Sequence, residues 1–197
     1  MTSQNPDVPL NGLCPKYVRH SEIEDKAKVL YAEMVGMAIQ EGYCYASNSF
    51  LGEIFSVSER TIKKWLNALE SIGVVSRSYD QTRKKHKRRM YMPWDNLTLP
   101  LNGWIPAHVR RAPITGGAKI LYAEISGMTY EEEYCFASNI HFADRFNVSK
   151  RTIQNRLTEL EDVKLISIHH LNIHDSEEEE KHPRRIYLEK YHGPPTR

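Results

Sequence analysis

Several kinds of signal are missing from this sequence of 197 residues. Its three cysteines, Cys14, Cys44 and Cys135, form no C-x-x-C pair, which argues against a disulfide framework and against a structural zinc site. No stretch approaches the roughly 18 consecutive apolar residues of a transmembrane helix. The N-terminal segment also lacks the pattern of a signal peptide. These absences predict a cytoplasmic protein with reduced, buried thiols.

Enzymatic signatures are missing as well. The sequence contains no glycine-rich phosphate loop, no nucleophile elbow and no paired carboxylates at a metal-binding spacing. Four histidines near the C-terminus have no cysteine beside them, so they do not form a recognisable metal-binding motif. We therefore predict a protein without enzymatic activity, cofactor or metal. The four histidines are His169, His170, His174 and His182.

The sequence does contain a long internal repeat. The segment Pro9–Arg77 aligns without a gap with Pro100–Ile168, and nearly half of the aligned residues are identical. Such self-similarity indicates a duplicated structural unit. We predict two domains, 9–95 and 100–190, each large enough to bury a core of its own. The connector between them is too short to be a free tether, which favours a defined arrangement of the two domains.

Each repeat is predicted to contain three helices. Apolar residues at helical spacing predict the first helix over about 24–39. Ser47 or Asn48 is expected to cap a second helix with Phe50 on its inward face. Ser58 is expected to cap the third helix after a short turn. The second and third helices then form a helix-turn-helix.

Extended segments complete the predicted fold. Val18-Arg19 and Val109-Arg110 are predicted to be extended pieces that precede the first helix of each repeat. Val74-Val75 and Met90-Tyr91-Met92 predict two strands that pair as a hairpin, the wing. The expected fold class is therefore α+β, mainly α, with two tandem winged helix-turn-helix domains.

The third helix of each repeat has the pattern of a recognition helix. Such a helix packs one face on its own domain and presents the other to the major groove. Ile62, Leu66 and Leu69 form the predicted buried stripe. Arg can bind guanine in a bidentate manner, Asn can read adenine, and Lys and Thr commonly contact phosphates. A charged helix face is often merely solvated, but the turn, the capped helix and the repeat together favour DNA binding. The predicted DNA-binding residues are Ser58, Arg60, Thr61, Lys63, Lys64 and Asn67 in the first repeat, and Ser149, Lys150, Arg151, Thr152, Gln154, Asn155 and Thr158 in the second.

The two wings differ in charge. The formal net charge of the chain is only +2, yet residues 58–90 contain ten Lys and Arg against three Asp and Glu. A basic hairpin tip beside a recognition helix can follow phosphates or enter the minor groove. The second hairpin contains Glu177–Glu180, which a phosphate backbone repels. That wing is expected to point away from DNA, to contact a protein, or to be disordered. The predicted phosphate contacts of the first wing are Arg83, Lys84, Lys85, Lys87 and Arg88.

Three short motifs carry a resemblance to a known family. They are Ala-Lys-x-Leu-Tyr-Ala-Glu at 27–33 and 118–124, followed in each repeat by Tyr-Cys-x-Ala-Ser-Asn and Val-Ser-x-Arg-Thr-Ile. Together they resemble the helix-turn-helix domain of replication initiators and replisome organisers from phages and plasmids of Gram-positive bacteria, and of regulators on the same mobile elements. The resemblance implies double-stranded DNA as the partner and 58–67 and 149–158 as recognition helices. The tandem arrangement and the acidic second wing depart from the single-domain pattern.

Two functions follow from this resemblance. In the first, the chain is a sequence-specific DNA binder, monomeric when free, that regulates transcription or marks a site as an accessory factor. In the second, it is an origin-binding initiator that recruits replication proteins. Only the acidic wing and short tails are left for contacts with such proteins, so the first function is favoured.

Overall fold

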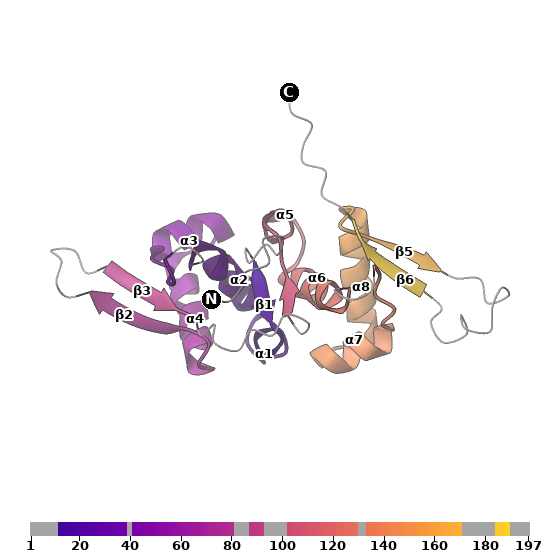
Figure 1. Ribbon diagram of the computed structural model, residues 1–197, viewed down its shortest axis with the longest axis horizontal. Coiled ribbons are helices and arrows are strands. Elements are labelled where there is room, and N and C mark those ends of the chain that lie inside the picture. Colours follow the sequence, from indigo (N-terminus) through magenta and orange to yellow (C-terminus); the bar gives the residue numbers. More distant parts are fainter. Residues whose placement is uncertain are drawn as a thin grey trace, which may run out of the picture.

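The protein is described by a computed structural model in which two repeats lie side by side with a wing at each end (Figure 1). The fold is α+β and mainly helical, with two tandem winged helix-turn-helix units, as predicted. No helix in the described part of the chain is long and apolar enough to cross a membrane. The structure describes residues 12–38, 41–80, 87–92, 102–129, 133–170 and 184–189.

The first repeat begins with a short strand and a one-turn helix that the sequence did not predict. Three longer helices and the hairpin of the first wing follow. Its elements are β1 (Leu13–Pro15), α1 (Lys16–Arg19), α2 (Asp25–Ala38), α3 (Asn48–Phe55), α4 (Glu59–Ser71), β2 (Ser76–Asp80) and β3 (Lys87–Tyr91).

The second repeat has the same order of elements. In both repeats the two wing strands pair in antiparallel fashion, and the strand before the first helix pairs with its counterpart in the other repeat. Its elements are β4 (Asn102–Trp104), α5 (Ala107–Arg111), α6 (Gly116–Met128), α7 (Asn139–Phe146), α8 (Lys150–Asp162), β5 (Ile166–His170) and β6 (Arg184–Leu188).

Serine caps and a left-handed residue define the helix-turn-helix. The Ser47 side chain accepts a hydrogen bond from the backbone N–H of Phe50 (3.1 Å), so Ser47 rather than Asn48 caps α3. Ser58 caps α4 in the same way. Between them Ser56 adopts φ 52°, which ends α3 and turns the chain toward α4.

Two predicted extended segments are helical. Val18-Arg19 lies in α1 and Val109-Arg110 in α5, which corrects the prediction. Both residues of each pair are buried. A strand would point neighbouring side chains to opposite faces, whereas a helical turn lets both reach the interior.

The positions of two apolar segments also differ from the prediction. Phe50 is 48% exposed, because α3 is only eight residues long and buries just Leu51 and Gly52. Val74 and Val75 are buried as expected, but the strand β2 starts only at Ser76.

The strands β1 and β4 join the two repeats around an approximate two-fold axis. Leu13 pairs with Trp104, and these two residues occupy equivalent positions in the repeats. Cys14 pairs with Gly103, and on the other side of the axis the backbone N–H of Ile105 donates to the carbonyl of Gly12 (2.8 Å). Figure 1 shows the same relation for the helices, since α1 and α5 lie on opposite sides of the centre.

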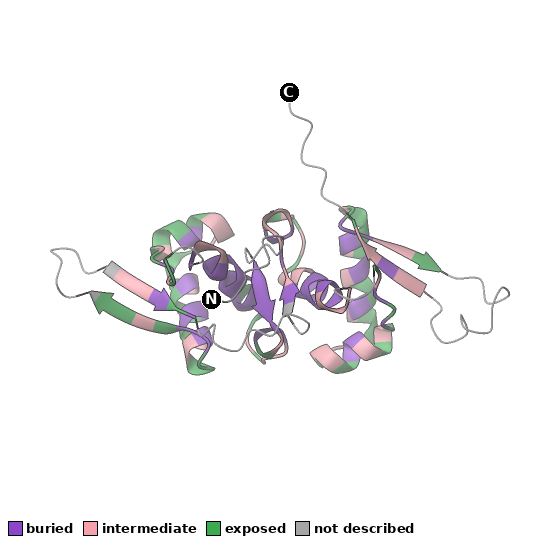
Figure 2. Ribbon diagram, viewed as in Figure 1, coloured by how far each residue is buried: buried purple, intermediate pink, exposed green. Residues whose placement is uncertain are grey.

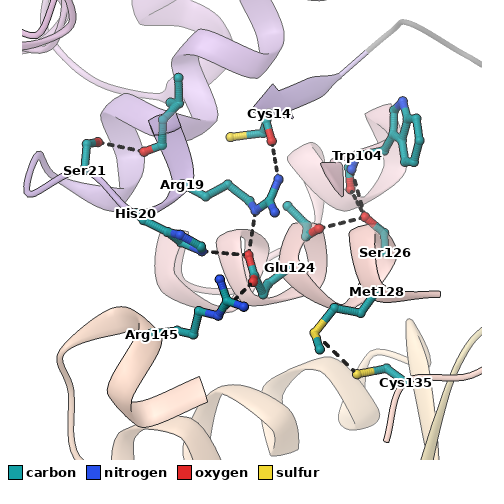
Figure 3. A network of polar contacts seen from close by, with 12 residues as sticks. Cys14, Arg19, His20, Ser21, Trp104, Glu124, Ser126, Met128, Cys135 and Arg145 are labelled. Atoms are coloured by element: carbon teal, nitrogen blue, oxygen red, sulfur yellow. Dashed lines mark hydrogen bonds and ion pairs between the residues drawn. The ribbon is translucent and has the colours of Figure 1, made fainter. Parts of the chain in front are cut away.

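A buried carboxylate crosses this interface from the second repeat. Figure 3 shows Glu124 of α6 between Arg19, His20 and Arg145. Arg19 Nε donates to Glu124 Oε2 over 2.8 Å, and its Nη1 donates to the carbonyl of Cys14 over 2.6 Å. Burial alone would raise the pKa of Glu124, but hydrogen bonds from His20 and Arg19 and the charge of Arg19 lower that pKa to about 2.

The reciprocal contact crosses from the first repeat. Arg110 Nε pairs with Glu33, and its Nη1 donates to the carbonyl of Ile105 (2.6 Å). Arg110 and Glu33 are the counterparts of Arg19 and Glu124, so the interface is self-complementary, as in a symmetric homodimer. Charges buried this deeply are stable only when paired. The two repeats are therefore held in one fixed arrangement, as the short connector predicted.

The two repeats pack against each other through one continuous hydrophobic core. The buried side chains of both belong to a single cluster, and Figure 2 shows that α2 and α6 at its centre are mostly buried. Gly103 is needed where β4 crosses α6, because a Cβ there would lie 1.7 Å from the carbonyl oxygen of Ala123. The division into domains 9–95 and 100–190 stays a prediction.

Candidate nucleic-acid interface

The helices α4 and α8 each have a buried and an exposed face. Ile62, Leu66 and Leu69 are fully buried, which confirms the predicted stripe. Trp65, buried beside them, packs edge-on against Phe55 at 5.9 Å between ring centroids. In Figure 2 buried and exposed segments alternate along both helices. The outward face of each helix is thus free to meet a partner.

Cationic side chains at the start of each helix are exposed and form no ion pair within the described residues. Ser58 accepts from the backbone N–H of Thr61 (3.2 Å), and the two hydroxyls are 3.1 Å apart, so this pair mainly builds the cap. Arg60 and Lys63 are exposed and form no ion pair within the described part of the chain. The second repeat matches this arrangement, with Ser149 and Thr152 in the cap and Lys150 and Arg151 exposed.

Lys64 has a partner within the protein. Its ammonium group pairs with Glu24, which lies just before α2, although the Lys64 side chain is 68% exposed. Trp65 Nε1 donates to the other oxygen of Glu24 (2.6 Å). The hydrogen bonds from Lys64 and Trp65 lower the pKa of Glu24. The charge of Lys64 is therefore partly neutralised in the free protein.

Asn67 is held by a side chain from the wing. Arg77, on β2, donates from Nη2 to Asn67 Oδ1 over 2.8 Å. The same guanidinium binds Glu70 through Nε (3.0 Å) and Nη2. The hydrogen bond between them lowers the pKa of Glu70 and raises that of Arg77. A fork of this kind fixes the orientation of both partners.

The exposed face of α8 is built differently. Gln154 Oε1 accepts from Asn139 Nδ2 at the start of α7 (2.9 Å). Asn155 and Thr158 are exposed and form no hydrogen bond within the described residues. Arg156, which takes the place of Trp65, donates to Asp25 Oδ2 in the first repeat (3.0 Å).

Both recognition helices flank the start of α2. Glu24 contacts α4, and the next residue, Asp25, contacts α8. The first turn of α6 lies there too, because a Cβ on Gly116 would lie 3.1 Å from the backbone nitrogen of Lys26. Thr115, which caps α6, donates from its backbone N–H to Glu159 of α8 (2.7 Å). Both helices therefore contact the segment at the start of α2, where the first turn of α6 also lies.

In the first wing, Arg88 points toward its own domain. Its Nη1 donates to Asn48 Oδ1 (2.6 Å) and its Nη2 to the carbonyl of Ala46 (2.7 Å). Partial burial lowers the pKa of Arg88. These two hydrogen bonds hold Arg88 against the start of α3. The predicted contact between Arg88 and a phosphate would require them to break. On the other face, Arg89 lies over the ring of Tyr43 at 5.0 Å.

Several predicted residues lie outside the described part of the chain. These are Arg83, Lys84 and Lys85 of the basic wing and Glu177–Glu180 of the acidic wing, and the same holds for the side chain of Lys87. Within the described residues, no three His, Cys, Asp or Glu side chains gather where a metal ion could bind.

Sequence reasoning missed the protein partners of the recognition helices. Glu24, Arg77 and Arg156 were not among the predicted site residues, although each touches or belongs to one of these helices. One signal was available for Arg77. The two-residue period of an extended segment places Arg77 on the same face as Val75, which is buried, whereas its pairing with Met90 appears only in the structure.

Comparison with protein families agrees with this geometry. A model described as a helix-turn-helix domain matches residues 21–75 and again residues 112–166. The two matches cover more than half of the chain, and each includes the three helices of one repeat. Comparisons with curated proteins and with solved structures found no match. The chain therefore belongs to the helix-turn-helix domain family and contains two copies of this domain.

Proposed function

We propose that this chain binds double-stranded DNA sequence-specifically, with α4 and α8 in successive turns of the major groove. The observation that carries the proposal is the approximate two-fold arrangement of the repeats, in which both partly exposed helices contact the start of α2. Helix-turn-helix dimers use the same symmetry across two subunits, with half-sites about one helical turn apart. Here one chain supplies both halves.

The exposed polar residues of α4 and α8 support base and phosphate contacts. Arg60 and Arg151 stand at equivalent positions near the helix starts, where base edges are usually met. Lys63 is replaced by Gln154, and Lys64 by Asn155, so the two helices present different groups. The two half-sites are therefore expected to differ in sequence.

The wings are proposed to divide their roles. Arg83, Lys84, Lys85 and Lys87 follow phosphates beside the first half-site, because cations there release counterions from the duplex. The glutamates Glu177–Glu180 avoid the backbone and are available for a protein partner.

The biological role proposed is that of a regulator or site-marking accessory factor on a plasmid or phage. The resemblance of the repeated motifs to domains of mobile-element proteins supports this origin. Two recognition helices locked at fixed spacing suit a factor that stays on one site. A replication initiator is the alternative role, and in it the acidic wing would contact replication proteins.

Footprinting on the genetic element that encodes the chain tests this proposal. One monomer is expected to protect two unlike half-sites with centres roughly 34 Å apart. Protection of one half-site per chain, or a need for dimerisation before binding, would contradict it. A site beside a promoter supports transcriptional control, whereas repeated sites within an origin would favour the initiator.

Salt dependence tests the basic wing separately. Replacing Arg83, Lys84, Lys85 and Lys87 with Ala should weaken all duplexes alike. Each lost phosphate contact should lower the slope of log affinity against log salt by about 0.9. An unchanged slope would show that this wing is only solvated. Replacing Glu177–Glu180 with Gln is the matched change in the other wing, and it should not lower the slope.

A further inference from the structure

Two cavities lie at equivalent places between the repeats, and their charged linings differ. The first is lined by Arg19 and Lys28 of the first repeat together with the end of α7. The second, with a volume of about 250 Å³, is lined by their counterparts Arg110 and Lys119 together with the end of α3. The approximate two-fold axis relates the two cavities, so their charges can be compared position by position.

The cations of the first cavity are balanced within the protein. Lys28 Nζ donates to Asp25 Oδ1 over 3.1 Å, and Arg156 Nη2 donates to Asp25 Oδ2 over 3.0 Å. Arg19 is paired with the buried Glu124 over 2.8 Å. Each of these three cations thus has a carboxylate of the chain as its partner.

The second cavity lacks one of the equivalent carboxylates. Gly116 stands where the first cavity has Asp25, so Lys119 has no acid at the position that holds Lys28. The Lys119 ammonium group donates instead to the carbonyl of Arg110 over 2.6 Å, which uses one of its three N–H donors. Its other two donors form no hydrogen bond or ion pair within the described residues, so they can serve a ligand.

Two further cations line the same cavity. Lys26 and Arg111 are exposed and form no ion pair within the described part of the chain. The only acid among the described lining residues is Glu33, which is already paired with Arg110. Burial and the neighbouring charge of Lys26 both lower the pKa of Lys119. Three cations therefore line a space to which the described chain supplies no unpaired carboxylate.

We propose that this cavity binds the phosphate group of a small organic molecule, which takes the place of the missing carboxylate. A phosphate monoester carries a charge of about −1.5 to −2 at neutral pH and presents three strong acceptor oxygens, so it suits three cations better than a carboxylate does. Arginine binds phosphate through two parallel N–H groups, and lysine binds it as a point charge. Ile54 and Phe55 also line the cavity and offer apolar surface to the organic part of the ligand.

Calorimetric titration of the full-length chain with phenyl phosphate tests the site. One molecule should bind per chain, and inorganic phosphate should bind more weakly because it lacks the apolar part. Gly116→Asp supplies the carboxylate found in the first cavity, and it should weaken phenyl phosphate binding by roughly tenfold or more, the effect of one lost charge-assisted hydrogen bond. Gly116→Ala is the matched control. Its Cβ also lies 3.1 Å from the backbone nitrogen of Lys26 but adds no charge, so it should bind like the wild type.

Lysine variants give a second measurement. Lys119→Met keeps an apolar stem and removes the charge, so it should also weaken phenyl phosphate binding by roughly tenfold. Lys16 does not line the cavity, and Lys16→Met should leave the affinity unchanged. The proposal is overturned if the wild type binds no phenyl phosphate, if Gly116→Asp binds it as tightly as Gly116→Ala does, or if benzoate binds as tightly as phenyl phosphate.

The same titration with duplex DNA present identifies the source of the phosphate. The duplex that the chain protects in footprinting is added until it saturates the protein, and phenyl phosphate should still bind. Loss of phenyl phosphate binding would assign the cavity to a phosphate of the DNA backbone and overturn the small-molecule ligand. Failure of the proposed function would differ, because the chain would then bind no duplex while its affinity for phenyl phosphate stayed intact.

Discussion

The two repeats share their helix caps and buried contacts but differ in the residues around the exposed sides of α4 and α8. Both use a serine cap for the recognition helix and a left-handed residue, Ser56 or Asn147, at the end of the helix before it. Both bury a cysteine whose thiol lies 3.9 Å from a methionine sulfur, Cys44 beside Met37 and Cys135 beside Met128. These shared features set the path of the backbone, so the two recognition helices are held in equivalent positions.

The exposed surroundings of the recognition helices have diverged. In α4, Trp65 binds Glu24 of its own repeat, whereas its counterpart Arg156 reaches across to Asp25. Arg77, which contacts Asn67 and Glu70 in the first repeat, is replaced by Ile168 in the second. The two repeats therefore keep the interactions that place the helix and differ in the contacts on its exposed side.

The largest effect is expected from breaking the reciprocal charges that hold the repeats together. Glu124→Ala leaves Arg19 buried without its main partner, and the change should lower the free energy of unfolding by about 3–5 kcal/mol. Glu33→Ala removes the equivalent partner of Arg110 and should cost a similar amount. Chemical denaturation of both variants measures these losses.

Glu22→Ala is the control for that comparison. Glu22 is exposed, so its removal should change the free energy of unfolding by less than about 0.5 kcal/mol. If Glu124→Ala were as stable as Glu22→Ala, the buried pair would not hold the interface.

A pH titration should follow the contribution of Glu124 to stability. Glu124 has its pKa lowered from 4.5 to about 2. It therefore contributes stability that is fully present above pH 4.5 and is lost as the pH falls toward 2, by an amount on the order of 3 kcal/mol. Thermal unfolding of the wild type and of Glu124→Gln should converge on acidification. Curves that stay parallel down to pH 2 would contradict this.

Substitutions in α4 and in α8 should affect DNA binding differently. Arg60→Ala is expected to reduce affinity by about 1–3 kcal/mol if that side chain grips a base. Asn155→Ala should relax base preference in one half-site and leave non-specific binding nearly intact, because the amide carries no charge. Competition against a shuffled duplex measures both. An unchanged preference in Asn155→Ala would mean that α8 does not read sequence.

The smallest effect concerns the acid beside α4. Glu24→Gln should release Lys64 for a phosphate and steepen the salt dependence of binding by up to about 0.9. Gln can still accept from Trp65, so the packing of the helix is kept. Glu159→Gln is the matched change near α8, where no lysine is paired, and it should leave the slope unchanged. Equal slopes in Glu24→Gln and the wild type would show that Lys64 does not reach DNA.

Much of each repeat could be predicted from the sequence. Apolar spacing located α2 and α4, and side-chain oxygen atoms before polar helix starts identified the cap at Ser58. These features are local, so their physical cause lies within a few residues. The exposure of Phe50 was not predictable, because it depends on how short α3 is and on which side of it packs.

The interface between the repeats could not be predicted. Nothing in the sequence pattern marks Arg19 or Glu33 as buried charges, and each pairs with a residue of the second repeat. The same holds for Asn67, whose partner Arg77 comes from the wing. Contacts of this kind depend on tertiary arrangement, and hydrophobic periodicity carries no information about it.

The pairing of Leu13 with Trp104 has a consequence for how such a chain can change over time. In a homodimer, a residue on the two-fold axis meets its own copy, so every substitution there occurs twice and must fit itself. Here the two residues on the axis are encoded separately, and a leucine faces a tryptophan. Because both repeats lie in one chain, the residues at the centre of the molecule need not be complementary to copies of themselves. The same freedom extends to α4 and α8, so the DNA site that we propose for them need not be a palindrome.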